Sequence, residues 1–286
     1  MNAAMHVVPL PPDVPDPGPV PLLQSAAAAR ALATGRVAVV AGGGQMIARA
    51  VILRRFGVGA TLQGPLWDPA SSGDLRIAAL RTLRRHGLRL AEAADDADAA
   101  LFRAAGFRAV ATPAHVAELD LRPDPAARRR ALDGKWRNCL RTAEAAGLTL
   151  RHRALGGPAD PLLAAEAAQR RARRYHALPL RFPVAFPGAE VVEALRDGTP
   201  LAAMLFLRHG AAATYHIGHT TPEGRSCEAH RLILWHIAGR LAAEGCIRLD
   251  LGTIDTETAP GLARFKLGTG ATVRRLGGSF LAIPGL

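Results

Sequence analysis

The sequence predicts an α/β protein made of two domains of one kind in tandem. Its 286 residues match two domains at roughly 150 residues each. The chain is 49% hydrophobic and 21% charged, a balance that excludes wholesale disorder. Each half shows the same order of elements: two strand-like runs joined by a turn that contains glycine, then a helical pattern, and then another strand. This repeated order predicts the tandem arrangement.

The first segment, residues 1–21, is expected to be an extended leader. Each proline in it fixes φ and removes a backbone donor, which favours an extended chain; the prolines are Pro9, Pro11, Pro12, Pro15, Pro17, Pro19 and Pro21. An N-terminal domain at 22–122 and a C-terminal domain at 123–286 follow. We place their boundary at Pro123-Asp124-Pro125, because this tripeptide is a helix-start signal.

In the N-terminal domain the clearest signal is a β-hairpin. Two β-branched runs, Arg36–Ala41 and Met46–Arg55, flank the turn Gly42-Gly43-Gly44. A hairpin explains these glycines better than a phosphate-binding loop, because no P-loop pattern surrounds them. The other expected elements are a helix at Leu22–Ala33, a strand at Ala60–Gln63, a helix at Asp74–His86, a strand at Leu88–Glu92, a short helix ending at Gly106 and a strand at Ala117–Leu121.

In the C-terminal domain the first expected helix runs from Pro125 to about Ala146. Leu132, Trp136 and Leu140 form its apolar stripe near a 3.6-residue period. The later elements are a strand at Leu148–Ala154, a helix at Pro161–His176, an irregular Pro/Phe stretch, a hairpin of Leu201–Arg208 and Ala212–His219, a helix at Cys227–Glu244, a strand at Ile247–Leu251, a loop, and a strand pair of Thr272–Leu276 and Ser279–Ile283.

The chain is strongly basic. It has 36 Lys and Arg against 24 Asp and Glu, a formal net charge of +12, and nearly all of the basic residues are Arg. Such an excess indicates a polyanionic partner such as nucleic acid, a nucleotide or anionic lipid. An Arg-rich, Ala-rich composition typical of GC-rich coding explains the same charge without a partner, and both interpretations stay open.

The cysteines and the hydropathy pattern exclude other classes. Cys139, Cys227 and Cys246 stand far apart, which argues against a disulfide framework and a zinc site. No apolar run approaches the ~18 residues that span a bilayer, and the N-terminus lacks the pattern of a signal peptide. We therefore expect a cytoplasmic protein without a metal.

The sequence holds no recognisable hydrolase machinery. No G-x-S-x-G motif is present, and no cysteine lies in a nucleophile context. His216 and His219 are three residues apart on an expected strand, which would put their side chains on opposite faces. A metal pair is therefore not expected there.

Two arginine-rich helices are candidate phosphate contacts. The first carries Lys135 and Arg137, and the second carries four arginines: Arg170, Arg171, Arg173 and Arg174. Guanidinium groups bind phosphate through charge-assisted bonds, although any single arginine is equally explained as part of a solvated face. Together the two clusters favour a ligand that bears phosphate.

The region before the last strands holds the strongest candidate for catalysis. Lys266 follows Phe265 in what reads as a loop flanked by Gly261 and Gly268. Glycine lets backbone approach a ligand, and an ordinary lysine would be a fixed positive charge there. A lysine on a solvated surface is the alternative.

Several motifs resemble those of the FemABX-like transferases, a family of tandem GNAT-fold enzymes. The similarity covers nearly the whole chain after the leader. The matching segments are Leu23-Gln24-Ser25, Gln63–Trp67, Leu119-Asp120-Leu121, Lys135–Asn138, Tyr215–Gly218, Leu234-Trp235, Leu249–Gly252 and the Phe265-Lys266-x-Gly268 element. The resemblance implies two GNAT-like domains, each with a mixed, mostly antiparallel sheet flanked by helices.

The resemblance also implies amide-bond formation. In the best-known members an aminoacyl group moves from aminoacyl-tRNA to an amine of a peptidoglycan precursor, and relatives act in natural-product assembly. The catalytic lysine of the family falls on Lys266, beside Phe265, where an ammonium stabilises developing negative charge. The residues expected to contact the substrates are Arg137, Lys135, Trp67, Tyr215, Asp250 and Asp255.

The donor is the main open choice. GNAT enzymes bind the pyrophosphate of CoA through a glycine-rich turn at a helix N-terminus. The matching segment, Pro222–Ala229, has no second glycine in register and adds Glu228. We therefore favour aminoacyl-tRNA, with Arg225, Ser226 and the Arg170–Arg174 cluster as phosphate contacts and no bound cofactor. The alternatives are an acyl-CoA or carrier thioester donor, and a non-enzymatic nucleic-acid or peptide-binding module.

Overall fold

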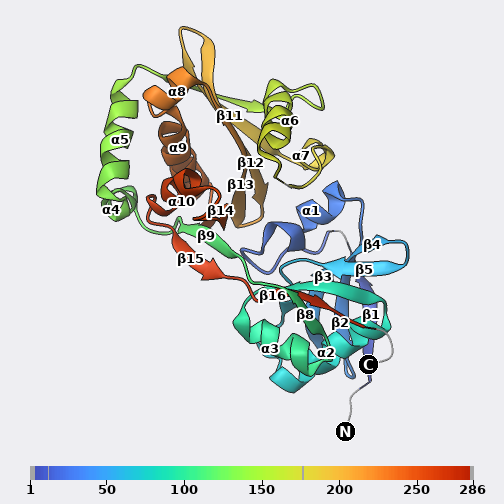
Figure 1. Cartoon of the computed structure of the whole chain (residues 1–286). Coiled ribbons are helices and arrows are strands. Elements are labelled where there is room, and N and C mark those ends of the chain that lie inside the picture. Colours follow the sequence, from blue (N-terminus) through green and yellow to red (C-terminus); the bar gives the residue numbers. More distant parts are fainter. Residues whose placement is uncertain (1–3, 12, 176, 284–286) are drawn as a thin grey trace. The chain divides into compact units, whose positions relative to one another are not determined.

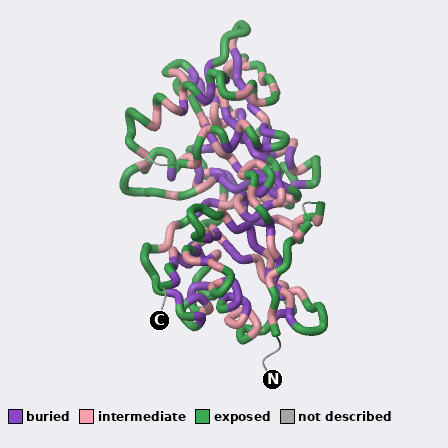
Figure 2. The backbone as a smooth tube through the Cα atoms, turned by 90° about the vertical axis from the view of Figure 1, so that its right-hand side faces the viewer, coloured by how far each residue is buried: buried purple, intermediate pink, exposed green. Residues whose placement is uncertain are grey.

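The computed structural model describes residues 4–11, 13–175 and 177–283 (Figure 1). The chain divides into two compact units. Unit 1 comprises Met1–His115 and Arg274–Leu286, and unit 2 comprises Val116–Val273. In both units the buried residues follow the strands and inner helix faces, and the turns are exposed (Figure 2). Within the described ranges, no helix is long and apolar enough to cross a membrane.

Unit 1 contains two sheets. The first has the strand order β1-β2-β3-β6 and the second has the order β4-β5-β7-β16-β8. The strands are β1 (Met5–Leu10), β2 (Arg36–Ala41), β3 (Met46–Val51), β4 (Leu53–Arg55), β5 (Val58–Thr61), β6 (Leu66–Trp67), β7 (Leu88–Ala93), β8 (Arg108–Ala111) and β16 (Gly278–Leu281). The helices are η1 (Leu22–Gln24), α1 (Ala26–Ala31), α2 (Gly73–Arg85) and α3 (Asp96–Ala104).

The expected hairpin around the triple glycine is confirmed, because β2 and β3 pair antiparallel with Val39 opposite Ala48. The leader, in contrast, is not merely an extended segment. Its residues Met5–Leu10 form β1, which pairs antiparallel with β2. Pro9 lies opposite Val37 on this edge strand. An edge strand tolerates the missing N–H of proline, which reconciles the proline-rich sequence with a sheet.

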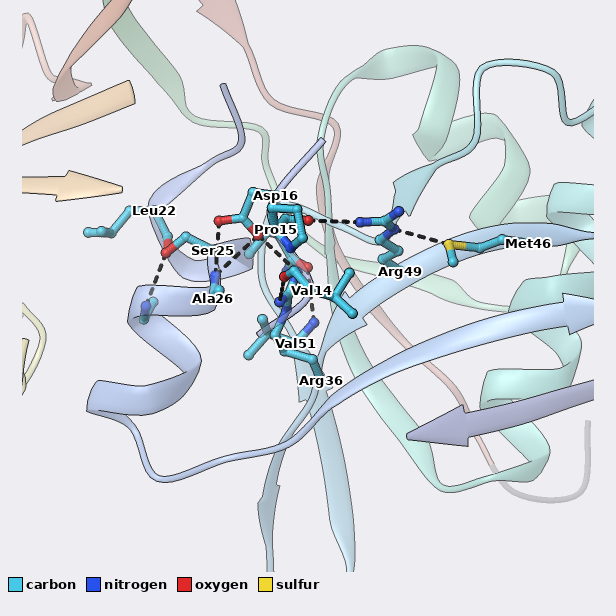
Figure 3. A network of polar contacts seen from close by, with 12 residues as sticks. Val14, Pro15, Asp16, Leu22, Ser25, Ala26, Arg36, Met46, Arg49 and Val51 are labelled. Atoms are coloured by element: carbon cyan, nitrogen blue, oxygen red, sulfur yellow. Dashed lines mark hydrogen bonds and ion pairs between the residues drawn. The ribbon is translucent and has the colours of Figure 1, made fainter. Parts of the chain in front are cut away.

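A polar network fixes the rest of the leader (Figure 3). The guanidinium of Arg36 is buried, forms an ion pair of 2.9 Å with Asp16, and donates to the carbonyl of Val14 at 2.7 Å. Asp16 also accepts from the backbone N–H of Ala26 in the first turn of α1 at 3.1 Å. One carboxylate therefore joins the leader to β2 and to the start of α1.

Unit 2 is built on one sheet of order β10-β11-β12-β13-β14-β9-β15. Its strands are β9 (His115–Asp120), β10 (Thr149–Ala154), β11 (Ala189–Arg196), β12 (Thr199–His209), β13 (Ala212–Thr220), β14 (Arg248–Ile254) and β15 (Thr272–Arg275). Its helices are α4 (Pro125–Ala131), α5 (Gly134–Ala145), α6 (Pro161–Arg173), α7 (Arg181–Ala185), α8 (Pro222–Ser226), α9 (Ala229–Ala243) and α10 (Pro260–Leu267). Helices α5 and α9 lie on one side of the sheet, and α6 and α7 lie on the other (Figure 1).

The fold class is confirmed: mixed, mostly antiparallel sheets are flanked by helices, although unit 1 divides its strands between two sheets. Several elements differ from the expected ones. The helix expected at 125–146 is interrupted at Leu132, whose ψ of 139° is extended, and Asp133 caps the new helix. The helix expected from Cys227 begins at Ala229, after the short α8. Strands β8 and β11 were not expected.

The last two strands do not pair with each other as expected. Strand β15 belongs to the sheet of unit 2, whereas β16 lies between β7 and β8 in unit 1. The ring of Phe280 on β16 is fully buried and stacks on Phe102 at 5.3 Å, which explains why the chain returns to unit 1. The C-terminal domain predicted at 123–286 therefore differs from unit 2, because residues 274–286 belong to unit 1.

We expect Asp16→Ala to lower the free energy of unfolding by about 3 kcal/mol or more, because it leaves the buried Arg36 guanidinium without its anion. Chemical denaturation measures this loss. Asp13→Ala is the matched control, since Asp13 is exposed. Equal stability of the two variants would contradict a structural role for the Asp16–Arg36 pair.

Candidate active site

The sheet of unit 2 opens between β13 and β14. These strands pair in parallel only where Ala212–Thr214 lies opposite Arg248–Asp250, and for the described residues the ladder between them ends there. Strand β13 also carries a bulge, because Leu205 lies opposite Ile217 while Phe206 lies opposite Tyr215. The extra residue is His216. A bulge bends its strand, so the two strands diverge just beyond Asp250.

Lys266 contacts β14 beyond the part of the strand that pairs with β13. It lies on α10, not in a loop as the sequence suggested, and its side chain is 6% exposed. Its Nζ donates to the carbonyl of Thr253, on β14, at 2.7 Å. A Cβ atom on Gly252 would lie 3.5 Å from the same Nζ. The ammonium therefore lies directly against the backbone of the diverging strand.

Burial lowers the pKa of Lys266 to about 8, and the charge of Asp250 opposes this shift. The expectation of an ordinary, unperturbed lysine is therefore wrong. Asp250 is itself buried and accepts from the N–H of Gly252 at 2.7 Å. Below pH 8 the site holds a desolvated ammonium beside a carboxylate, an arrangement suited to stabilising negative charge that develops on a substrate.

The neighbours of Lys266 in the chain hold α10 in place. The indole Nε1 of Trp136, on α5, donates to the carbonyl of Phe265 at 3.0 Å. A Cβ atom on Gly268 would lie 2.7 Å from Cδ1 of Trp136, so only glycine fits beside this ring. The N–H of Asp133 donates to the carbonyl of Gly268 at 2.9 Å. The Phe265-Lys266-x-Gly268 element is thus a docking site for α5 that aims Lys266.

The first turn of α9 packs on the same aromatic pair. The guanidinium of Arg231 lies 5.7 Å from the Trp136 ring and 5.8 Å from the Phe265 ring. Arg231 also pairs with Glu228. One residue earlier, the half-buried His230 donates through Nε2 to the carbonyl of His219 at 2.8 Å, which ties α9 to the end of β13. Four elements therefore meet around Phe265.

The other residues predicted to contact substrates lie in different surroundings. Asp250 alone accompanies Lys266. Asp255 is exposed and accepts from the backbone of Glu257 and Thr258, so it shapes the turn before α10. Tyr215 lies at the bulge of β13, and burial raises the pKa of its hydroxyl.

Arg137 and Lys135 lie on α5, and Trp67 lies in unit 1. The Arg137 guanidinium donates to the carbonyl of Leu132 at 2.9 Å and so caps the end of α4. Lys135 is exposed. Trp67 donates through Nε1 to Asp98 at 2.6 Å, and burial raises the pKa of this carboxyl to about 6. This hydrogen bond holds Trp67 within unit 1.

The predicted donor-binding residues differ in whether their side chains already bond to other parts of the protein. Arg225 donates to the carbonyl of Thr220 at 2.9 Å, and Ser226 donates through its hydroxyl to Glu223 at 2.7 Å. Arg170 pairs with the buried Glu166 at 2.7 Å. The exposed members of the second cluster are Arg171, Arg173 and Arg174.

Sequence reasoning missed some of the residues that build the site. Thr253 contributes only its carbonyl, which no side-chain pattern reveals. The sequence predicts Trp136 only as part of an apolar helix stripe, and its Nε1 bond joins it to a residue 129 positions away. Glu166 gave one local signal, its i,i+4 spacing from Arg170. Within residues 4–11, 13–175 and 177–283, no group of three or more His, Cys, Asp or Glu is arranged to hold a metal ion.

The burial of Lys266 predicts a stability cost. A pKa lowered from 10.5 to about 8 means that the fold disfavours the charged form by about 3 kcal/mol below pH 8. Lys266→Met should raise the free energy of unfolding at pH 7 by about 1–3 kcal/mol. It removes this cost, and the loss of one hydrogen bond offsets part of the gain.

The sign follows from proton binding. Between pH 8 and 10.5 the unfolded chain binds the proton that the native lysine has lost, so wild-type stability rises with pH and the advantage of Lys266→Met shrinks. Urea denaturation from pH 7 to pH 10 measures this. An advantage that does not change with pH would contradict burial of the ammonium.

Comparison with known proteins supports the resemblance. Residues 126–267 match the family model described as acetyltransferase (GNAT) domain. FemX superimposes with a TM-score of 0.72 at 15% identity, covering 92% of each chain. A tandem GNAT protein from the clavulanic acid biosynthesis pathway gives 0.54 at 16% identity, covering 99% of this chain and 100% of that one. L-PGS from Bacillus licheniformis gives 0.51 at 13% identity, covering 84% and 82%.

No curated protein matches the chain in sequence. The family model supports an acyltransferase and leaves its donor and acceptor open. At these identities the structural similarity shows the fold, and the family model identifies the kind of domain. Residues 126–267 therefore match a GNAT domain, and the chain shares its fold with FemX and with the tandem GNAT protein.

Proposed function

We propose that the protein forms an amide bond by moving an aminoacyl group from aminoacyl-tRNA to an amine. The acceptor class is a small molecule or peptide with a free amine, such as a peptidoglycan precursor or a natural-product intermediate. The observation that carries the proposal is the buried Lys266 ammonium, which donates to the Thr253 carbonyl on β14 beyond the part of that strand that pairs with β13. The FemX-like fold supports the aminoacyl form of this chemistry.

The reaction needs a group that stabilises an oxyanion. The lone pair of the amine attacks the ester carbonyl, and negative charge gathers on the carbonyl oxygen. The C–O bond to the ribose then breaks, and the ribose oxygen takes up a proton as the amine loses one. A desolvated ammonium within reach of either oxygen lowers the barrier more than an exposed one, because little solvent screens it. Lys266 has this character.

The start of α9 argues against pyrophosphate binding. A phosphate cradle requires backbone N–H groups that point to the ligand. Around α8, the N–H groups of Gly224, Arg225 and Cys227 already donate to Thr221 Oγ1, Thr221 O and Glu223 O. The N–H of Glu228 donates to Arg225 O, and the Glu228 carboxylate adds a negative charge nearby. A donor other than CoA fits this segment better.

An acyl-CoA-dependent N-acyltransferase is the second candidate. The match of residues 126–267 to the acetyltransferase (GNAT) model supports it. Native mass spectrometry of the freshly purified protein distinguishes the candidates, because bound tRNA and bound CoA differ greatly in mass. Incubation with total aminoacyl-tRNA or with acetyl-CoA, each with a mixture of amines, then tests for transfer. Transfer from acetyl-CoA alone would replace the aminoacyl proposal.

Replacing Lys266 should slow transfer without releasing the donor. We expect Lys266→Ala to reduce turnover by roughly 10²–10³-fold, the usual loss of one oxyanion-stabilising group. Lys266→Arg should restore only part, because the guanidinium fork is wider than an ammonium. Single-turnover kinetics measure both, and the matched control is Arg264→Ala, an exposed cation on the same helix α10. Wild-type transfer by Lys266→Ala would make Lys266 a structural residue.

Donor affinity should depend on salt through the exposed arginines that follow one another in and after α6. We expect the triple variant of Arg171, Arg173 and Arg174 to alanine to flatten the slope of log affinity against log salt by about 2–3 units. Arg170 is left intact because it pairs with Glu166. A triple variant of the exposed Arg55, Arg85 and Arg108 is the charge-matched control. Equal slopes for wild type and the α6 variant would contradict tRNA contact there.

A further inference from the structure

Unit 2 has a second pocket, at the opposite end of β14 from Lys266. Its volume is about 360 Å³, and it is lined by the segment before α4, by α4 itself and by the last turn of α9. Apolar residues form much of its wall, among them Leu121, Pro125, Ala242 and Ile247. Ile247 precedes β14, whereas Lys266 contacts Thr253 near the end of that strand, about 20 Å further along. The pocket is therefore separate from the candidate active site.

One buried cation lines this pocket. Arg128 is 7% exposed, and its Nε is buried without a hydrogen-bond partner. Across the described part of the chain, no acceptor bonds its guanidinium, and Asp124, one helical turn earlier, is its electrostatic neighbour. Asp124 uses its carboxylate to cap α4, accepting from Ala127 N at 2.8 Å. Burial lowers the pKa of Arg128, as expected for a charge with little compensation.

The Arg128 side chain is not needed to stabilise the helix end beside it. A cation often stabilises the carbonyls at a helix C-terminus, and the end of α9 lines this pocket. Two of those carbonyls already accept backbone bonds: Gly245 N donates to Ala242 O at 3.0 Å, and Cys246 N donates to Leu241 O at 2.9 Å. The other cation of the pocket, Arg122, is engaged in a two-pronged bond with Asp120 at 2.9 and 2.7 Å.

A buried guanidinium Nε without a partner is costly, and a ligand that supplies acceptors to this guanidinium removes that cost. One free positive charge among apolar walls matches a single negative charge on an apolar body. A carboxylate meets this requirement and accepts two parallel bonds from the guanidinium fork. A phosphate dianion does not, because one arginine leaves a negative charge in partly apolar surroundings.

We propose that this pocket binds a small apolar monocarboxylate through Arg128. The site stands apart from acyl transfer and does not rest on the proposed donor or acceptor. It gives the protein a second, small-molecule ligand beside its substrates.

The test uses benzoate and benzamide, which share a shape and differ in charge. Ligand-observed NMR and calorimetry on the full chain should show saturable benzoate binding and benzamide binding weaker by about tenfold or more. Arg128→Met should reduce benzoate affinity by the same factor. Arg130→Met is the matched control, because Arg130 is exposed on the same helix and does not line the pocket.

The remaining outcomes also decide the proposal. Arg128→Met should fold at least as stably as wild type without ligand, since it removes an uncompensated charge. If it fails to fold, Arg128→Lys serves instead, because it keeps the charge, loses the fork and should still weaken benzoate binding. Benzoate binding that survives in both Arg128 variants, equal binding of benzamide, tighter binding of inorganic phosphate, or no saturable binding would each overturn the proposal.

Discussion

The hydrogen bond from Trp136 to the Phe265 carbonyl is the contact on which the candidate site depends. It joins α5 to α10 across 129 residues of sequence, and it is made next to Lys266. Gly268 gives the indole room, and the Asp133–Gly268 bond closes the other side of the contact. The position of the ammonium is therefore set mainly by how the two helices pack. The side chain of Lys266 adds one bond, to Thr253.

Among the described residues of unit 2, Lys266 and Arg128 are buried cations, and their surroundings differ in a way that bears on function. Lys266 has an acceptor at 2.7 Å and the Asp250 carboxylate nearby, so the protein itself supplies part of its compensation. Arg128 has neither a bonded acceptor nor an ion pair with any residue that the structure describes. Folding opposes both arrangements, since each holds a charge away from water. A cation that the protein partly compensates suits the stabilisation of a transient negative charge on a substrate. A cation that the protein leaves uncompensated suits the binding of a ligand with a permanent negative charge.

Local patterns predicted much of the fold and less of the site. Period and turn signals found the β2–β3 hairpin, α2 and α9, because these depend on residues close in sequence. They failed where distant packing decides. Residues 260–267 read as a glycine-flanked loop, yet they form a helix once Trp136 and Asp133 contact it. The motif identified Lys266, but its lowered pKa and its bond to a backbone carbonyl come from tertiary burial that one sequence does not encode locally.

The lowered pKa extends what Lys266 can do in acyl transfer. At pH 7 a group with a pKa of about 8 is still roughly nine-tenths protonated, so it acts as a cation in most molecules. A lysine with a lowered pKa is a stronger acid than an ordinary lysine, so it gains more by passing its proton to a departing ribose oxygen. A pKa closer to the working pH improves the match for proton donation. In the proposed reaction, burial of Lys266 against β14 therefore gives one side chain two capacities, charge stabilisation and proton transfer. Both depend on the protonated form, so both fade as the pH rises through 8, which distinguishes Lys266 from a general base.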